Sequence, residues 1–236
     1  MCRYEIQRWL LKKNLTKAKV TINGFWPNQL NHCISFENPC LTEMQITEGK
    51  LVIELKKFDS PFNLIFVGRI DAAKGVDILI DFIRDINNKD IGFFHVVGEG
   101  ELRGEFENVL NEVGIPNKFY GNLTQVELFE LLKISHCILL PSKSEGFPKV
   151  LAEAMNFGCI PIASNVGSIS HYIQDAVSGI ILDEIFEKSL NDAWQNFLNL
   201  NSEAKLRMAQ NGIEVSQYFT FEKYINNLKL KIFNVS

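Results

Sequence analysis

The sequence lacks a long apolar run and an excess of positive charge. No segment is long or apolar enough to cross a bilayer, and the start at Met1–Tyr4 does not begin a signal peptide. The formal net charge of −4 and the pI of about 5.7 argue against a general nucleic-acid binder. We therefore expect a cytoplasmic protein whose basic residues act on anions only locally. Peripheral contact with the inner face of a membrane stays open.

The spacings of several reactive sites are also missing. The five cysteines show neither a pairing pattern nor metal spacing, which predicts reduced and mostly buried thiols. They are Cys2, Cys33, Cys40, Cys137 and Cys159. The four histidines are scattered, and His95 and His136 lie in strand-like runs, which favours core positions over metal ligation. No Gly-x-Ser-x-Gly elbow is present, so the signature of a serine hydrolase is absent.

What the sequence does have, from residue 62 onward, is a regular alternation of short apolar runs and amphipathic segments. Strands are predicted over 63–67, 92–97, 118–120, 136–140, 159–163 and 179–182. Helices are predicted over 75–87, 101–113, 124–134, 148–157, 186–199, 202–218 and 221–233. This alternation favours βαβ units and an α/β fold with a Rossmann-like parallel sheet flanked by helices.

The first 60 residues follow no such rhythm. A helix is predicted around residues 4–13, and residues 18–22 and 51–55 are candidate strands. Asn23-Gly24 is a turn signal. Two later helices have defined ends: Thr124 precedes a candidate capping box, and Pro148 suits the first position of a helix for which Gly158 suits the residue past the end.

Four loops are expected at one edge of the sheet, where ligands of open parallel sheets bind. They follow predicted strands at residues 68–69, 98–100, 121–123 and 141–147, and each carries a glycine that permits close backbone approach to a ligand. The Gly98-Glu99-Gly100 run hints at a dinucleotide fingerprint. However, the third glycine is Gly104 rather than residue 103, so we interpret the run as a tight turn.

Arg69 and Lys74 are candidate phosphate ligands. An arginine offers a rigid fork for phosphate oxygens, and a lysine offers a compact point charge. Gly75 follows and is expected to open the next helix, whose N-terminus also favours anions. The alternative is a pair of solvated surface cations, which their place at a strand-to-helix turn makes less attractive.

Glu145 and Glu153 are two candidate ligand-binding carboxylates at the start of a predicted helix. Glu145 precedes the helix expected at Pro148, and the amides of Gly146 and Phe147 would be free to donate to a ligand. Glu153 lies on the margin of that helix's apolar stripe, where a carboxylate needs a partner such as a ribose diol. The alternative for Glu153 is a glutamate on the helix flank that reaches water.

Taken in order, these residues resemble a known family. The matching segments are Phe66–Ile70, Lys74-Gly75, Val97–Gly100, Tyr120–Leu123, Pro141-Ser142 and Glu145–Met155. Over roughly residues 62–233 the chain resembles the C-terminal, donor-binding domain of retaining GT-B glycosyltransferases of the family 4, or group 1, type. The resemblance implies a metal-free enzyme that needs no cofactor, with a UDP- or GDP-linked sugar as substrate. It also implies a glycan or lipid-linked acceptor, in cell-surface polysaccharide or lipopolysaccharide synthesis.

The resemblance also implies a role for each site residue. Arg69 and Lys74, in the loop that starts at Gly68, match the pair that holds the leaving diphosphate. Glu145 matches the glutamate near the donor sugar, and Glu153 matches the glutamate that binds the ribose diol. The remaining matches are Gly146, Phe147 and Pro148 under the sugar, Val150 and Leu151 at the phosphate, and Leu123, whose backbone reads the base.

The chain departs from the family in two places. Val166–His171 places serine and histidine where the family often has a second glycine and a glutamate. In addition, residues 1–60 are too few for a complete N-terminal domain, so they are assigned as its remnant. The donor domain is assigned to residues 61–200 and the C-terminal helices to 201–236. The final helix would cross toward the missing domain or a partner chain, which leaves part of its apolar face uncovered.

Four functions compete at this point. The first is a transferase donor domain, feeble or inactive alone, as expected of a fragment or one half of a split enzyme. The second is a non-catalytic nucleotide-sugar-binding module that acts through a partner. The third is a GT-B-like sugar-nucleotide epimerase. The fourth is an unrelated doubly wound domain for another phosphate ligand, against which the motif set argues strongly.

Overall fold

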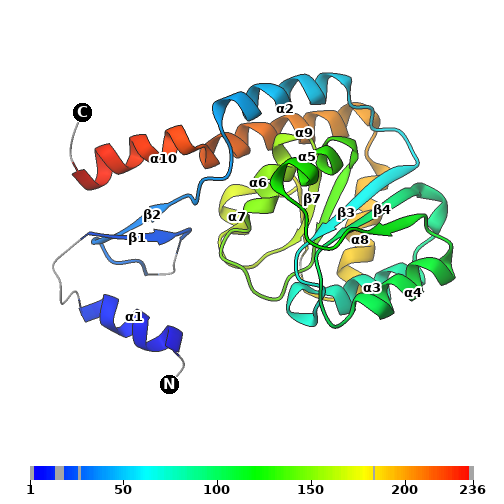
Figure 1. The fold of residues 1–236 in the computed structure, drawn as a ribbon, viewed down its shortest axis with the longest axis horizontal. Helices are drawn as coiled ribbons and strands as arrows, with labels where there is room; N and C mark the ends of the chain where they lie inside the picture. Colours follow the sequence, from blue (N-terminus) through cyan, green and yellow to red (C-terminus); the bar gives the residue numbers. More distant parts are fainter. Residues whose placement is uncertain (1–2, 14–18, 26–27, 183, 234–236) are drawn as a thin grey trace.

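The computed structural model describes residues 3–13, 19–25, 28–182 and 184–233. Its largest part is a six-stranded parallel sheet with the order β5-β4-β3-β6-β7-β8 (Figure 1). The strands are β3 (Phe62–Val67), β4 (Ile91–Val97), β5 (Asn117–Phe119), β6 (Cys137–Leu140), β7 (Ile160–Ser164) and β8 (Ile180–Leu182). Each lies within one residue of its predicted bounds, and the predicted fold class is confirmed.

The order of the strands reverses between β3 and β6. The chain runs outward from β3 through β4 to β5, then returns to pair β6 with the other side of β3, where Leu64 faces Cys137 and Ile65 faces Ile138. From β6 it runs outward again through β7 to β8. The connections after β3 and β6 therefore leave the carboxyl ends of these strands in opposite directions along the sheet. In doubly wound folds this switch point is where ligands bind.

Helices cover both faces of the sheet (Figure 1). They are α2 (Glu43–Leu55), α3 (Val76–Asp85), α4 (Arg103–Val113), α5 (Gln125–Ile134), α6 (Lys149–Asn156), α7 (Ile169–Tyr172), α8 (Glu187–Asn199) and α9 (Ser202–Ser216). Under α3, α4 and α8 lies a core that contains Phe66, Phe106 and Trp194. Under α5 and α6 lies a second core that contains Ile138 and Leu151. The two cores hold the sheet rigid beneath its loops.

The predicted strand over residues 51–55 is wrong, because these residues form the last turns of α2. Thr42 and Gln45 form a capping box that starts this helix: the Thr42 side chain accepts from the Gln45 amide, and the Gln45 side chain accepts from the Thr42 amide. Ile46 and Ile53, seven residues apart on one face, are buried against the domain. The capping box was visible in the sequence and outweighs the β-propensity of Val52 and Ile53.

A small N-terminal part lies beside the large sheet (Figure 1). The predicted helix is α1 (Arg3–Lys13), and the predicted strand is β1 (Val20–Asn23). Residue 18 lies outside the described residues. An unpredicted strand, β2 (Cys33–Phe36), pairs with β1 in parallel. Residues 1–60 thus include a two-stranded sheet of their own, and their assignment as a domain remnant stays a prediction.

The C-terminal segment reaches from the domain back to this small part (Figure 1). The predicted helix over 221–233 is α-helical in α10 (Phe221–Asn227) and continues as a π-helical segment over Leu228–Phe233. Phe221 and Ile225 are exposed, in keeping with an uncovered apolar face. Tyr224 instead packs edge-on against Phe36 of β2, with ring centroids 5.5 Å apart.

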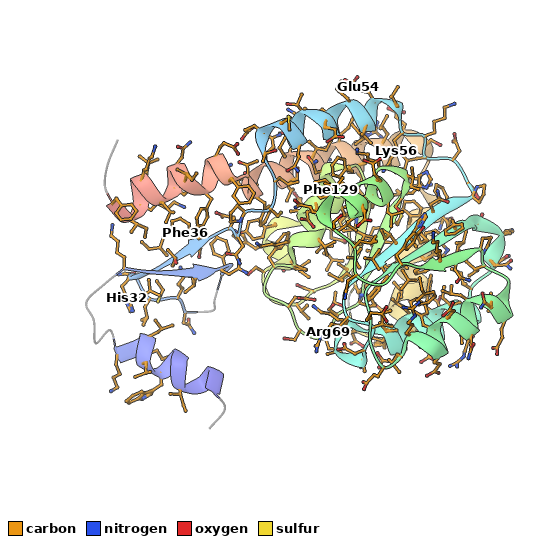
Figure 2. The ribbon with its side chains drawn as sticks, viewed as in Figure 1. His32, Phe36, Glu54, Lys56, Arg69 and Phe129 are labelled. Carbon is orange, nitrogen blue, oxygen red and sulfur yellow. The ribbon has the colours of Figure 1, made fainter. Side chains whose placement is uncertain are left out.

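At the amino edge of the sheet, Lys56, labelled in Figure 2, connects α5 and α6 through hydrogen bonds. Its Nζ donates to the carbonyl oxygens of Ser135 and Phe157, each at 2.6 Å, and of Leu132 at 3.3 Å. These carbonyls lie at the carboxyl ends of the two helices, where a cation also complements the helix dipole. Burial lowers the pKa of Lys56.

Candidate functional site

Lys74 and Glu145 meet at the switch point between β3 and β6. Lys74 ends a 3-10 turn (Ala72–Lys74) in which Asp71 Oδ1 accepts from the Lys74 amide at 3.0 Å. Its Nζ lies 2.5 Å from Glu145 Oε1. The side chains are 25% and 10% exposed, respectively, so this pair is only partly screened by water. The predicted convergence of these two loops is confirmed, and it places one cation and one carboxylate side by side.

Arg69 does not join this pair. Its guanidinium is 72% exposed and forms an ion pair with Asp71 at 3.1 Å. In Figure 2 it lies at the margin of the domain, on the loop that leaves β3. It therefore lies at the expected edge of the sheet, but its side chain is directed toward water rather than toward Lys74.

The loops after β3, β4 and β5 pack closely against one another. Gly98 has a φ of +128°, and a Cβ there would collide with the carbonyl oxygen of Gly68. Gly98 also donates its amide to the Gly121 carbonyl at 2.7 Å. The run 98–100 is thus a tight turn, as predicted, and only glycine fits this approach. Leu123, further along the last of these loops, is half-buried against the core under α5 and α6.

The loop before α6 presents backbone amides at the same edge. Within the described residues, the amides of Gly146 and Phe147 have no hydrogen-bond acceptor. The helix begins at Lys149, and Pro148 is its N-cap. Pro148 was predicted as the first helical residue, so the helix starts one residue later than predicted. The amide of Leu151 donates to the Pro148 carbonyl at 3.0 Å. The helix start at Lys149, which is exposed, and Val150, which is half-buried, is therefore the part of α6 with donors to spare.

The side chain of Phe147 anchors this loop from below. It is buried, stacks on Phe219 with ring centroids 4.5 Å apart, and contacts Tyr172 edge-on at 4.9 Å. Gly146, in contrast, is exposed. The loop is thus held by its apolar residue, whereas the amides of Gly146 and Phe147 have no acceptor among the described residues.

Glu153 is buried in α6, is 8% exposed and is in contact with Gln125 of α5. The Gln125 side chain donates to Glu153 Oε1 at 2.8 Å and is the one hydrogen-bond partner of this carboxylate among the described residues. Burial raises the pKa of Glu153, and the Gln125 hydrogen bond partly opposes that shift. Glu153 is therefore not a glutamate that reaches water along the helix flank.

The segment that departs from the family pattern packs against the glutamate loop. Ser168 donates its amide to the Gly146 carbonyl at 2.8 Å, and Gly167, with a φ of +61°, has no room for a Cβ beside the Glu145 carbonyl. The Ser168 hydroxyl accepts from the Phe25 amide at 2.8 Å. His171 lies against the Phe25 ring, with centroids 3.5 Å apart. This segment thus joins the turn after β1 to the candidate site.

Two contributors were missed by the sequence reasoning. Gln125 follows a helix cap, where side chains are usually solvated, and nothing in a single sequence marks it. Phe25 follows the Asn23-Gly24 turn signal, but its contact with Ser168 depends on a separation of 143 residues along the chain.

The cysteines and two of the histidines lie outside these loops and behave as predicted. Within the described residues, Cys33, Cys40, Cys137 and Cys159 are buried and unpaired, whereas Cys2 lies outside them. His95 is buried and His136 is half-buried, and burial lowers the pKa of each to about 4. No group of three or more His, Cys, Asp or Glu residues suited to a metal occurs in the described part of the chain. The expectation of a metal-free site stays a prediction.

A comparison with protein families matches residues 50–215 to the family described as glycosyl transferases group 1. The matched region covers more than half of the chain and contains Lys74, Glu145 and Glu153. The chain belongs to this family. The finer assignment, to family 4 and to retaining enzymes, stays a prediction.

Two curated proteins illustrate the relatives of this group 1 glycosyltransferase chain. It is 28% identical over 218 residues to an uncharacterized glycosyltransferase of Methanocaldococcus jannaschii, and the aligned region covers 92% of this chain and 58% of that protein. It is 32% identical over 156 residues to an alpha-1,4-N-acetyl-D-galactosaminyltransferase of Campylobacter jejuni named for a PP-undecaprenol-linked glycan, covering 59% of this chain and 42% of that protein. The chain therefore spans about half the length of these relatives.

Solved structures agree with the fold. The Anabaena protein HepE, crystallised in complex with UDP and glucose, superposes with a TM-score of 0.68 at 16% identity, covering 88% of this chain and 58% of that one. At this identity the likeness shows the GT-B Rossmann-like fold alone. In this group 1 glycosyltransferase chain, none of the helices among the described residues has the length and apolar character that crossing a membrane requires.

Proposed function

We propose that this chain is the donor-binding half of a retaining glycosyltransferase of the family 4 type. It binds a UDP- or GDP-linked sugar and, in the whole enzyme, transfers a hexosyl group to a glycan or lipid-linked acceptor. The observation that carries the proposal is the meeting of Lys74 and Glu145 at the β3/β6 switch point, with the buried Glu153 on the helix that follows Glu145.

Lys74, with Arg69, is assigned to the diphosphate. Breaking the bond between sugar and phosphate leaves negative charge on the diphosphate, which a preorganised ammonium group and free backbone amides stabilise. The exposed amino end of α6 adds a favourable dipole. Because the Arg69 side chain is 72% exposed and paired with Asp71 rather than with Glu145, it is assigned as a second, outer ligand of the phosphates.

Glu145 and Glu153 are assigned to opposite ends of the donor. Glu145 lies beside Lys74, where it faces the sugar and the positive charge that develops on it. Glu153, which lies in the second turn of α6, accepts hydrogen bonds from the ribose hydroxyls. The backbone between them, from Gly146 to Val150, lies under the sugar and the phosphates, while Gly68 and Leu123 line the nucleotide.

The acceptor is the less constrained part of the proposal. The Campylobacter jejuni relative is named for a lipid-linked glycan, which supports a role in polysaccharide or lipopolysaccharide synthesis, at the cytoplasmic side of a membrane. In the GT-B architecture the acceptor is held by the N-terminal domain.

A second candidate is a non-catalytic binding module that acts through a partner chain. A sugar-nucleotide epimerase is a weaker candidate, because both glutamates and the cation pair of a transferase are present.

Calorimetric titration of the chain with UDP-, GDP- and ADP-linked sugars tests the binding step. Saturable binding of at least one of them is expected, and no heat with any would refute the proposal. Incubation of the bound sugar with and without the products of neighbouring genes then tests transfer. NMR of the product's anomeric proton tests retention. Binding without turnover under every condition would favour the module.

A further inference from the structure

A single amide group ties the candidate ribose ligand to two other segments of the chain. Gln125 Nε2 donates to Glu153 Oε1 at 2.8 Å and to the Cys40 carbonyl oxygen at 3.1 Å. Gln125 begins α5, Glu153 lies in α6, and Cys40 lies in the connection between β2 and α2. One side chain therefore joins three elements at the carboxyl edge of the sheet.

The orientation of this amide is determined by its neighbours. A carboxylate oxygen and a backbone carbonyl only accept hydrogen bonds, so the NH2 group must face both of them. Its two protons are then fully used. The backbone under Gln125 is also fixed, because Thr124 and Glu127 form a capping box in which the Thr124 amide donates to Glu127 Oε2 at 2.8 Å.

The hydrogen bond leaves most of the Glu153 carboxylate available. A carboxylate has about four acceptor positions, and Gln125 uses one of them on Oε1. Two hydroxyls of a cis diol can therefore still donate to it. What Gln125 removes is the rotational freedom of a buried side chain that has no other hydrogen-bond partner among the described residues.

We propose that Gln125 is a positioning residue, which holds Glu153 in the orientation that recognises the ribose diol and thereby sets the preference for ribonucleotides over deoxyribonucleotides. This inference rests on the proposed function. Gln125 acts through Glu153, and the Cys40 carbonyl is its anchor.

The test is a comparison of Gln125→Leu with the wild type. Leucine is one bond shorter than glutamine but fills a similar volume, and it donates no hydrogen bond. The probes are UDP, GDP and ADP, followed by the 2′-deoxy and 3′-deoxy forms of whichever binds most tightly. In the wild type we expect the ribonucleotide to bind ~10-fold or more tightly than either deoxy form, since a hydrogen bond to a charged group is lost. In Gln125→Leu we expect that ratio to fall to ~3-fold or less, with the affinity for the deoxy forms nearly unchanged.

Gln217→Leu is the matched control. Gln217 Nε2 donates to Glu214 Oε2 at 2.8 Å, so the same change removes the same kind of bond at the same distance, from a pair of which neither residue lies in α5 or α6. Its ratio should equal that of the wild type. Gln125→Lys, which restores a donor to both acceptors, should recover part of the preference.

The outcomes separate this inference from the proposed function. If Glu153→Ala abolishes the ribose preference but Gln125→Leu keeps it, the function stands and the role of Gln125 is refuted. If Gln125→Leu weakens ribo and deoxy forms equally, the residue is merely structural. If the wild type binds no nucleoside diphosphate, or shows no ribose preference, the proposed ribose site fails and this inference fails with it.

Discussion

Replacing Lys74 with methionine isolates the contribution of one ammonium group. Methionine keeps much of the apolar stem, which runs past Gly68. In the free protein the change leaves Glu145, whose side chain is 10% exposed, without its cation. Leaving a partly buried charged acceptor without its partner costs about 1–3 kcal/mol of unfolding free energy. The variant should therefore be less stable than the wild type, yet folded.

The effect on ligand binding follows from which part of the ligand touches Lys74. A hydrogen bond from a charged group contributes about 1.5–3 kcal/mol, which corresponds to a loss of roughly 10- to 150-fold in affinity for a nucleoside diphosphate. The lower end is expected, because Lys74 already has a partner in the free protein and exchanges or shares it on binding. A nucleoside has no diphosphate, so its affinity should change by less than about twofold.

Calorimetry with the diphosphate and the nucleoside of the same base measures both effects. Lys133→Met is the matched control, because its side chain is 22% exposed and its Nζ lies 2.6 Å from both Glu48 and Glu130. Lys133 lies at the carboxyl end of α5, away from the loops at the candidate site. Unchanged diphosphate affinity in Lys74→Met would refute the reasoning. Equal losses for diphosphate and nucleoside would point to misfolding instead.

Three further predictions concern the ribose ligand, the buried histidines and a tight turn. Glu153→Ala should weaken a ribonucleoside diphosphate ~10-fold while leaving its deoxy forms unchanged, and unchanged ribonucleotide affinity in calorimetry would show that the ribose assignment is wrong. His95 and His136 have pKa values of about 4 against an ordinary 6.5, so the unfolded chain binds more protons between these pH values. The contribution of these histidines to the unfolding free energy should therefore be complete above pH 6.5 and be lost on acidification toward pH 4. The loss should be on the order of 1–2 kcal/mol for each histidine after allowing for partial exposure. A urea midpoint that does not change with pH across this window would contradict the prediction. Gly98→Ala should lower the unfolding free energy by about 2 kcal/mol or more, whereas Gly104→Ala, with open space around it in α4, should leave it equal or higher; equal urea midpoints for the two variants would count against the close approach to Gly68.

Local signals predicted the fold wherever they agreed with packing. Thr124 and Glu127 marked the start of α5 correctly, because the capping box satisfies amides that the helix leaves unpaired. The prediction of a strand at residues 51–55 was wrong, because the β-propensity of its β-branched residues is outweighed by a capping box that starts nine residues earlier, at Thr42. Burial of one helix face then decides the structure, and burial is not a local property.

The candidate site was predictable in its topology and not in its side-chain geometry. The alternation of elements implied parallel strands whose following loops share one edge of the sheet. That β3 and β6 are neighbours, which brings Lys74 and Glu145 together, is a finding of the structure. The outward orientation of Arg69 and the bridge made by Gln125 do not follow from any pattern. The bridge spans 28 residues to Glu153 and 85 residues to Cys40, and such contacts depend on how three segments pack.

Lys56 has a consequence for the opposite edge of the sheet. Its ammonium group fastens α5 to α6 at the ends remote from the candidate site, while their amino ends carry Gln125 and lead to Glu153. If the hydrogen bonds of Lys56 are lost, α5 and α6 can separate, and the separation is largest at the helix ends far from Lys56. The accuracy with which Gln125 and Glu153 are held together therefore depends on Lys56, which lies away from the candidate site.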